Sequence, residues 1–431
     1  MKQRQLLLSM LMVLAITLIG YIIKYFVDTL IATSIGAGAF GNFKLAIRVL
    51  FLANSIVLFG QDYNLVYFLS RYKNEKSPNK AHGYLLWLRD IFIAGSLITL
   101  ILASAIQVIS YLELTQWPTI NLDHPGYLIL FLVPLYALFK LGKLFHLYRK
   151  DYAKSMIPTE FSMPFIYYII TVSTLALGIS LTENIVLYLF GTSLFLVVIL
   201  QWSMAISPLK RIFKTKPKDE SSYWYSFSRT TWLVSILLIS TKTIAMASLE
   251  IFSPNEVIVG YFAAISTITY SYYVITEPIE FFLRPLISPH NPKKPVERTL
   301  QLMLNRCQIV RIFCIILIVG CCLAFGNNLL LWFGPQFVIA QKELILAAVL
   351  FGIYVFFRQC LDIIAYSGHQ KWLSKAIFLR VLSIGILSYI LIPKYHLLGA
   401  VLADGIPAAT LGFFAYIKLH SSTNLRLYKI V

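Results

Sequence analysis

The stretch Gly20–Arg71, GYIIKYFVDTLIATSIGAGAFGNFKLAIRVLFLANSIVLFGQDYNLVYFLSR, decides the fold of this chain. It contains two apolar runs, each long enough to cross a bilayer, joined by the short uncharged turn Ser34–Asn42. Five charged residues interrupt the runs: Lys24, Asp28, Lys44, Arg48 and Asp62. A charge near the bilayer centre costs about 2.5–3.5 kcal/mol on insertion scales, so such residues usually face a protein-lined or hydrated cavity. We interpret the stretch as one wall of a cationic cavity in a membrane protein.

The composition agrees with this interpretation. Apolar residues make up 58% of the 431 residues and charged residues only 13%, and the mean hydropathy is +0.74. These values exclude a soluble globular protein. The formal net charge of +18 comes from short basic clusters between apolar runs. The positive-inside rule produces this pattern, so we expect membrane lipids around the chain and no nucleic-acid partner.

We predict an all-α integral membrane protein with about twelve transmembrane helices. The apolar segments are approximately 6–33, 44–70, 87–110, 126–147, 156–179, 184–206, 226–250, 257–287, 307–325, 343–366, 371–392 and 397–419. Lysine and arginine cluster in every second gap between them, which predicts that both termini are cytoplasmic. Within the spans, Arg380 and Asp404 are expected to pair across the last two helices.

A charged, proline-containing connector divides the chain at its midpoint. We predict an N-terminal six-helix lobe over 1–206, a cytoplasmic connector over 207–225, and a C-terminal six-helix lobe with a short cytoplasmic tail over 226–431. A weak internal repeat supports this duplication, because Lys24 precedes Gly41 by 17 residues and Lys242 precedes Gly260 by 18.

The cations within the spans are the first candidates for a binding site. Lys24, Arg48 and Lys242 would form a cationic patch, and an arginine can bind phosphate through two parallel hydrogen bonds. Lys24 could instead serve only to neutralise Asp28 one helical turn away. Acidic residues toward the cytoplasmic half of their spans are candidates for ion coupling, or else partners of nearby cations: Asp62, Glu277 and Glu280.

Motifs of enzymes and metal sites are missing from the sequence. It has no G-x-x-x-x-G-K-[ST], H-E-x-x-H or G-x-S-x-G pattern, and its five cysteines form no C-x-x-C pair. We therefore predict that the protein is not an enzyme and uses neither a cofactor nor a metal.

Four segments carry a resemblance to a known family: SIGAGAFGNF (34–43), GQDYNLVYFLSR (60–71), LLLWFGPQFVIAQKELILAAVLFG (329–352) and LIPKYHLLGAVLADGIPA (391–408). They resemble the O-antigen (Wzx-type) polysaccharide flippases of the multidrug/oligosaccharidyl-lipid/polysaccharide exporter superfamily. The resemblance implies two six-helix lobes around a central cavity, with alternating access in the bacterial inner membrane. It also implies an undecaprenyl-diphosphate-linked oligosaccharide as substrate, turned from the inner to the outer leaflet.

The resemblance further assigns roles to individual residues. The cavity cations of the family match Lys24, Arg48 and Lys242, although the chain departs from the pattern by having lysine at two of these positions. Polar side chains would contact the sugars, namely Asn54, Gln61 and Asn64. A polysaccharide polymerase and chain-length components are candidate partners.

Two other functions stay open at this stage. A cation-coupled multidrug or metabolite antiporter would have the same fold, but a net-positive cavity disfavours cationic drugs. A membrane-embedded polysaccharide-assembly enzyme generally carries a large outward loop with catalytic residues, and no outward gap between the predicted spans is long enough for one.

Overall fold

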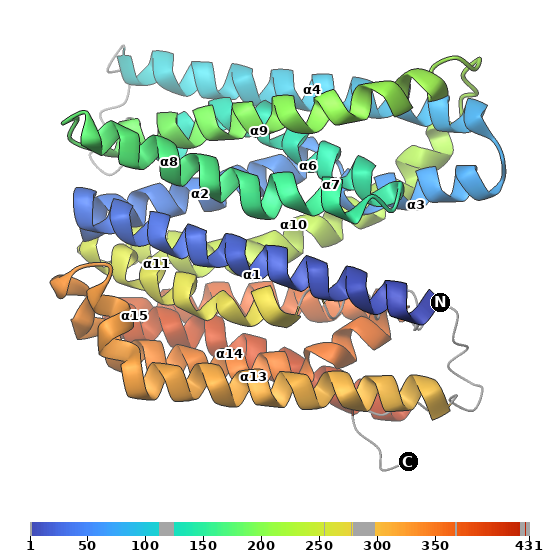
Figure 1. Ribbon diagram of the computed structural model, residues 1–431. Coiled ribbons are helices and arrows are strands. Elements are labelled where there is room, and N and C mark those ends of the chain that lie inside the picture. The colour runs from blue at the N-terminus through green and yellow to red at the C-terminus, as the bar shows by residue number, and fades with distance from the viewer. Residues whose placement is uncertain are drawn as a thin grey trace. The chain divides into compact units, whose positions relative to one another are not determined.

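The computed structural model describes residues 2–111, 125–253, 255–276, 278, 298–366, 369–422 and 427. Throughout this part of the chain the only regular secondary structure is helical, which confirms the predicted all-α fold (Figure 1). Ten helical runs in it are long and apolar enough to cross a membrane. The chain is therefore a multi-pass membrane protein.

The first half of the chain forms α1 (Lys2–Ile35), α2 (Ala37–Val57), α3 (Gln61–Asn74), α4 (Pro78–Tyr111), α5 (Pro125–Leu128), η1 (Ile129–Leu132), α6 (Val133–Tyr148), α7 (Tyr152–Met156), the π-helical η2 (Ile157–Ser162), α8 (Met163–Ala176) and α9 (Glu183–Ile212). The second half forms α10 (Ser221–Phe252), α11 (Val257–Thr269), α13 (Arg298–Leu331), η3 (Pro335–Ala340), α14 (Gln341–Tyr366) and α15 (Gln370–Ser422).

The predicted spans correspond to these helices where the structure describes them, and residues 279–287 of the predicted span 257–287 lie outside the described residues. Several spans need comment. The run from α7 through η2 to α8 fills the predicted span 156–179 but consists of three short pieces. The long α15 covers the last two predicted spans, because His396 interrupts it with a non-helical backbone (φ 47°, ψ −116°). A positive φ at a residue other than glycine is uncommon and here marks the sharp change of direction between two spans.

The second predicted span, 44–70, is in fact two helices. Between α2 and α3, Phe59 and Gly60 both have positive φ, 47° and 78°. Glycine tolerates this conformation because it has no Cβ. A Cβ on Gly60 would lie 2.6 Å from the Oγ1 of Thr231 on α10. The break therefore occurs where the chain passes close against another helix.

The predicted turn Ser34–Asn42 is much shorter than expected. Only Gly36, with φ 84°, separates α1 from α2. The residues after it are helical and pack tightly on α11, where a Cβ added to Gly260 would lie 2.0 Å from the carbonyl oxygen of Ala37. The small residues predicted to form a turn are therefore helical, and they allow α2 to approach α11 closely.

The helices form two compact units. Unit 1 contains residues 1–21, 28–41 and 244–431, and unit 2 contains residues 22–27 and 42–243. Both α1 and α10 therefore contribute residues to each unit. The division into lobes at the 207–225 connector stays a prediction.

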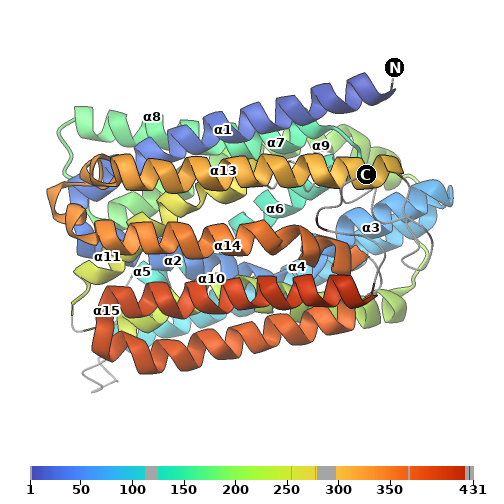
Figure 2. The same ribbon diagram turned by 90° about the horizontal axis from the view of Figure 1, so that it is seen from below.

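Unit 1 is built around α14. This helix packs against α13, α15 and α11, and Figure 2 shows α13, α14 and α15 running side by side. Leu304, Ile363 and Leu419 belong to its buried apolar core. Arg311 is fully buried beside this core and donates a hydrogen bond to the side-chain carbonyl of Gln359. Within unit 1, α1 begins at the end where α15 finishes (Figures 1 and 2).

Unit 2 has α6 at its centre. This helix contacts α3, α4, α7 and α9. It approaches α9 closely, because a Cβ on Gly142 would lie 2.6 Å from the side chain of Gln201. The indole Nε1 of Trp202 on α9 donates to the carbonyl of Leu138, at 3.0 Å. Residues along α6 are thus held among several helices.

The connector between the halves is bound to unit 2. Helices extend into the predicted segment 207–225 from both sides, so only 213–220 lie outside α9 and α10. A Cβ on Gly83 would lie 2.0 Å from the carbonyl oxygen of Lys218. The Glu220 carboxylate pairs with Lys80 at 3.0 Å. The connector is therefore fixed to the start of α4.

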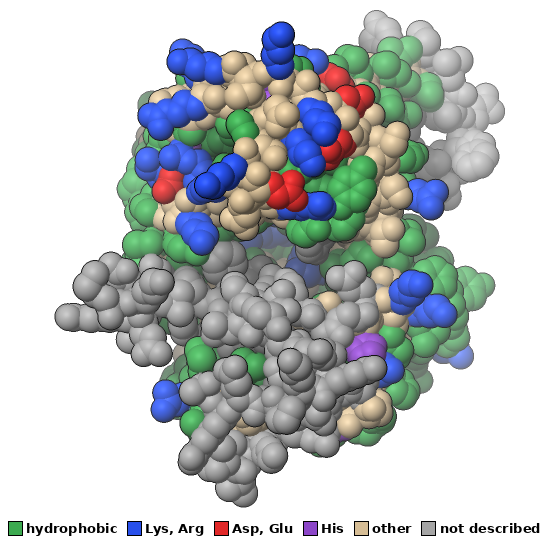
Figure 3. Space-filling model, turned by 90° about the vertical axis from the view of Figure 1, so that its right-hand side faces the viewer, with side chains coloured by type: hydrophobic (Ala, Val, Ile, Leu, Met, Phe, Trp, Pro, Cys, Tyr) green, Lys and Arg blue, Asp and Glu red, His purple; other side chains and the backbone are tan. Residues whose placement is uncertain are grey.

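One end of unit 2 is strongly basic. Figure 3 shows lysine and arginine gathered on this end, with few acidic side chains among them. Its exposed basic residues are Lys73, Lys76, Arg89, Lys150, Lys154, Lys210, Arg211, Lys214, Lys216 and Lys218. These are the clusters that predict a cytoplasmic face, and the orientation itself remains a prediction.

Candidate functional site

Every predicted site residue that the structure describes lies in unit 2. Lys24 on α1 and Lys242 on α10 are exposed, and Arg48 on α2 is half-buried. The acidic candidates Glu277 and Glu280 lie outside the described residues. Whether the three cations bind substrate stays a prediction.

The predicted sugar-binding amides are buried between helices. Gln61 donates from Nε2 to Ser228 Oγ at 3.0 Å and accepts a hydrogen bond from the hydroxyl of Tyr84. Asn64 donates from Nδ2 to Ser228 Oγ at 2.8 Å and to Thr231 Oγ1 at 2.9 Å. These bonds tie α3 to α4 and α10. The amide donors are already engaged, and a role in sugar binding stays a prediction.

Asn54 on α2 is also buried, and its Oδ1 has no hydrogen-bond partner within the part of the chain that the structure describes. A buried acceptor in this condition costs free energy unless water or a ligand supplies a donor. Asn64 Oδ1 is likewise buried without a partner among the described residues, so both asparagines can accept a further hydrogen bond.

Asp62, on α3, contacts the face of α10 that also carries Lys242. The Ser235 hydroxyl donates to Asp62 Oδ2 at 2.7 Å, while Oδ1 finds no partner in the described ranges. Ser235 and Lys242 are seven residues apart, which places them on one face two helical turns apart. An ion-coupling role for Asp62 stays a prediction.

A polar stripe on α6 adds candidate site residues that are not among those predicted from the sequence. Tyr136, Lys140 and Lys143 share one helix face by their spacing. The Lys140 Nζ lies 5.9 Å from the centroid of the Tyr136 ring. That ring stacks on Phe51 of α2 with centroids 5.2 Å apart. Phe51 follows Arg48 by three residues, so the Arg48 side of α2 faces the stripe.

The stripe ends at an ion pair. Lys143 Nζ lies 2.6 Å from Glu160 Oε1, and the two side chains keep 24% and 30% of their surface exposed. The positive charges of Lys140 and Lys24 also act on this carboxylate. Lys143 thus contacts the carboxylate, while Lys140 on the same face of α6 and Lys24 on α1 act on it through their charge. We call Lys24, Lys140, Lys143 and Glu160 the lysine cluster.

Glu160 is carried by the π-helical segment η2. Pro158 lies within this segment and Pro164 follows it, and each removes a backbone N–H from the normal hydrogen-bond ladder. The π-helix is rare and often occurs at functional sites. The Ser155 hydroxyl donates to the carbonyl of Lys143 at 2.9 Å, which fixes the two chain segments together.

Sequence reasoning missed this cluster for a specific reason. The positive-inside pattern accounts for Lys140 and Lys143 as basic residues near the end of an apolar segment, and no motif singles out Glu160. The available signal was the presence of opposite charges inside two consecutive apolar segments, 126–147 and 156–179. Such charges are expected to pair.

Unit 1 holds a separate charged group that is more enclosed. Arg380 and Asp404 pair at 3.7 Å with 6% and 13% of their side chains exposed, as predicted from the sequence. The Arg380 guanidinium lies 5.0 Å from the Tyr354 ring, and that of Arg358 lies 4.8 Å from the Tyr273 ring. The Arg380–Asp404 pair therefore neutralises its own charge.

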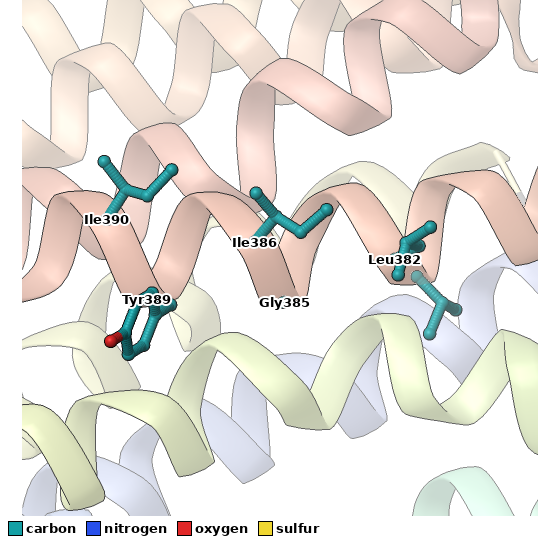
Figure 4. A pocket seen from close by; sticks show the side chains of 6 residues that line it. Leu382, Gly385, Ile386, Tyr389 and Ile390 are labelled. Carbon is teal, nitrogen blue, oxygen red and sulfur yellow. The ribbon is translucent and has the colours of Figure 1, made fainter.

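An apolar depression lies on α15 (Figure 4). Its lining residues are Val381, Leu382, Gly385, Ile386, Tyr389 and Ile390. Binding sites usually add a few polar groups that orient a ligand, and this surface offers almost none. It therefore fits contact with lipid chains better than a substrate site.

Elsewhere in the described ranges, no three histidine, cysteine or acidic side chains gather as metal ligands would.

Comparison with known proteins identifies the fold. Neither a protein-family model nor a curated protein matches the sequence. Among solved structures, the chain is similar to an inward-facing multidrug-resistance transporter of the MATE family in the MOP superfamily. That match has a TM-score of 0.71 and 11% identity, and covers 93% of this chain and 95% of the other.

Two further structures agree. The lipid II flippase MurJ in an inward closed conformation matches with a TM-score of 0.70 and 15% identity, over 95% of this chain and 87% of the other. A MOP-superfamily transporter from Pyrococcus furiosus, described as having a binding pocket of reverse polarity, matches with a TM-score of 0.65 and 12% identity, over 96% and 95%. The chain has the fold of MOP-superfamily transporters.

Proposed function

We propose that this protein is a flippase that moves an anionic lipid-linked oligosaccharide across the bacterial inner membrane for surface polysaccharide (O-antigen) assembly. The substrate head group would be the diphosphate of an undecaprenyl-diphosphate-linked glycan. The observation that carries the proposal is the lysine cluster, in which Lys143 pairs with Glu160 and the charges of Lys140 and Lys24 add to a cationic excess. The fold is one that both flippases and exporters use.

The lysine cluster suits a diphosphate by charge. At 4 Å, two unit charges interact by about 4 kcal/mol at an effective dielectric of 20, against about 1 kcal/mol in water. Lysines between helices therefore attract phosphate more strongly than lysines on the basic end of unit 2. Arg48, on the neighbouring face of α2, adds a group that can bind phosphate with two hydrogen bonds. The stacked rings of Phe51 and Tyr136 offer an apolar surface beside the cations.

A second candidate function is a multidrug or metabolite antiporter, favoured by the similarity to a multidrug transporter. A cationic drug would be repelled by the excess of lysine over glutamate in the lysine cluster. An antiporter with this lining would have to carry an anionic metabolite. The lipid-linked substrate is preferred because its tail could stay in the bilayer while only the charged head crosses.

The test is transport by the purified full chain in proteoliposomes containing a short-chain polyprenyl-diphosphate oligosaccharide. Lys140→Gln and Lys143→Gln together are expected to lower the flipping rate at least tenfold. Lys150→Gln, on the exposed basic end, is the matched control and should keep the wild-type rate. Equal rates in all three proteins would contradict the proposal, as would faster transport of a cationic dye than of the lipid-linked glycan.

A further inference from the structure

We infer that Glu160 is a resident counter-anion, which holds Lys143 while the site is empty and which the phosphate of the substrate displaces. This inference rests on the proposed function. It assigns to Glu160, which does not attract the anionic substrate, control over how tightly the lysine cluster binds phosphate. It concerns the affinity of the lysine cluster and its ability to release what it binds.

The ion pair is short but open. Lys143 and Glu160 lie 2.6 Å apart, yet about a quarter of each side chain remains accessible. The Arg380–Asp404 pair of unit 1 shows the opposite combination, since it is longer and almost fully enclosed. Partial exposure lets an incoming ion reach both charged groups, which the enclosed pair of unit 1 does not allow. The Lys143–Glu160 pair can instead exchange partners with an incoming ion.

The charges around Glu160 explain why an internal anion is needed. It contacts Lys143 on α6, and the charges of Lys140 on α6 and Lys24 on α1 also act on it. Thr159 beside it contributes a hydroxyl 3.4 Å from its Oε1. Without a carboxylate, the three ammonium groups would repel one another among apolar helices. A diphosphate supplies more negative charge than Glu160 does. It can therefore take over Lys143, and Glu160 can recover this lysine when the diphosphate leaves.

The backbone of Glu160 gives the carboxylate room to move. A π-turn contains an extra residue compared with an α-turn, and a shift by one residue rotates a side chain about the helix axis by about 100°. The η2 segment lies between α7 and α8, so a change in its turn would act where the helix is already irregular. The displaced carboxylate could thus swing away from Lys143.

Binding of farnesyl diphosphate to the purified full chain in detergent, measured by isothermal titration calorimetry, tests the inference. We expect Glu160→Gln to bind about tenfold tighter than wild type, because the phosphate no longer competes for Lys143. In proteoliposomes the same variant should flip the lipid-linked substrate more slowly, because release is impaired. Lys143→Gln should bind more weakly.

The matched control is Glu75→Gln. Glu75 also pairs with a cation, Arg71, at 2.7 Å in unit 2, but at the basic end and with greater exposure. The hydrogen bond from Arg71 keeps the pKa of Glu75 below its ordinary value, so this carboxyl is ionised as Glu160 must be in its pair. Removing its charge should leave farnesyl diphosphate affinity unchanged.

The outcomes distinguish a failure of the proposed function from a failure of the counter-anion role of Glu160. If wild type and Lys143→Gln bind farnesyl diphosphate equally, or neither binds it, the proposed function fails. If binding depends on Lys143 but a folded Glu160→Gln binds no tighter, the counter-anion role is overturned. Should Glu160→Gln not fold, Glu160→Asp keeps the charge on a shorter side chain. If Glu160→Asp folds and binds farnesyl diphosphate with wild-type affinity, the counter-anion role is overturned. Tighter binding by Glu160→Asp would support the role.

Discussion

Gly41 and Gly260 meet through their backbones, because a Cβ added to Gly41 would lie 2.6 Å from the nitrogen of Gly260. These two glycines, 219 positions apart in the chain, occupy matching places in the weak internal repeat. Each opens a span after a short turn, and neither position has space for a side chain. The repeat therefore coincides with a contact in unit 1.

Gly260→Ala is expected to destabilise the protein by about 1–3 kcal/mol, since the new methyl group would meet the fixed carbonyl of Ala37. Gly320→Ala on α13 is the matched control, because nothing lies within 4 Å of its added Cβ. That change should be neutral or stabilising by up to about 1 kcal/mol through helix propensity. Thermal unfolding midpoints of the purified proteins measure both effects. Equal midpoints would contradict the close contact.

Arg48→Ala should impair export of the lipid-linked glycan roughly tenfold or more, since a lost charge-assisted hydrogen bond costs about 1.5–3 kcal/mol. Lys44→Ala, one turn nearer the start of α2, should have a smaller effect. Arg48 lies beside Phe51, whose ring stacks on Tyr136 next to the lysine cluster. Complementation of a flippase-null strain at matched protein levels provides the measurement. The assignment of Arg48 fails if the two variants behave alike.

Lys24→Gln combined with Asp28→Asn removes both charges of a possible self-neutralising pair. We expect the double variant to insert normally but to export poorly, because the charge of Lys24 also acts on Glu160. Lys24→Arg, which keeps the charge, should retain part of the activity. Surface glycan should be compared at equal amounts of membrane-inserted protein. Wild-type export by the double variant would show that Lys24 serves insertion alone.

Gly83→Val should loosen the connector, because the added side chain would displace the carbonyl of Lys218 from its position 2.0 Å from the added Cβ. Hydrogen exchange of residues 213–220 is expected to become faster, while exchange in α13 stays unchanged. Glu220→Gln should have a weaker effect in the same direction, since partly exposed ion pairs contribute about 0–1 kcal/mol. Unchanged exchange in Gly83→Val would argue against a fixed connector.

Hydropathy alone predicts most of the fold, because burial in a bilayer demands long apolar helices whatever their neighbours are. The Arg380–Asp404 pair was also predictable, since charges within spans seek partners. The break at Gly60 was not, because it depends on Thr231, which is 171 positions away in the sequence. Sequence periodicity carries no information about such a distant approach.

The candidate site was only partly predictable for a related reason. The lysines of α6 lie near the end of an apolar segment, where the positive-inside rule accounts for them without any site. Their partner Glu160 becomes visible only once the π-helical turn and the packing of α7 against α6 are known. Conversely, Gln61 and Asn64 look available in the sequence, but the structure places their amides between helices.

The interleaving of the two units also bears on how the protein is made. Residues 22–27 and 42–243 leave the ribosome early enough for unit 2 to assemble while the rest of the chain is still being synthesised. Residues 1–21 and 28–41 belong with 244–431, so these early segments must wait for the second half of the chain before unit 1 is complete. At about 5–20 residues per second, that wait lasts roughly 20–80 s. A chain that stops near residue 243 would leave α1 without most of its partners, which exposes such truncated products to membrane quality control.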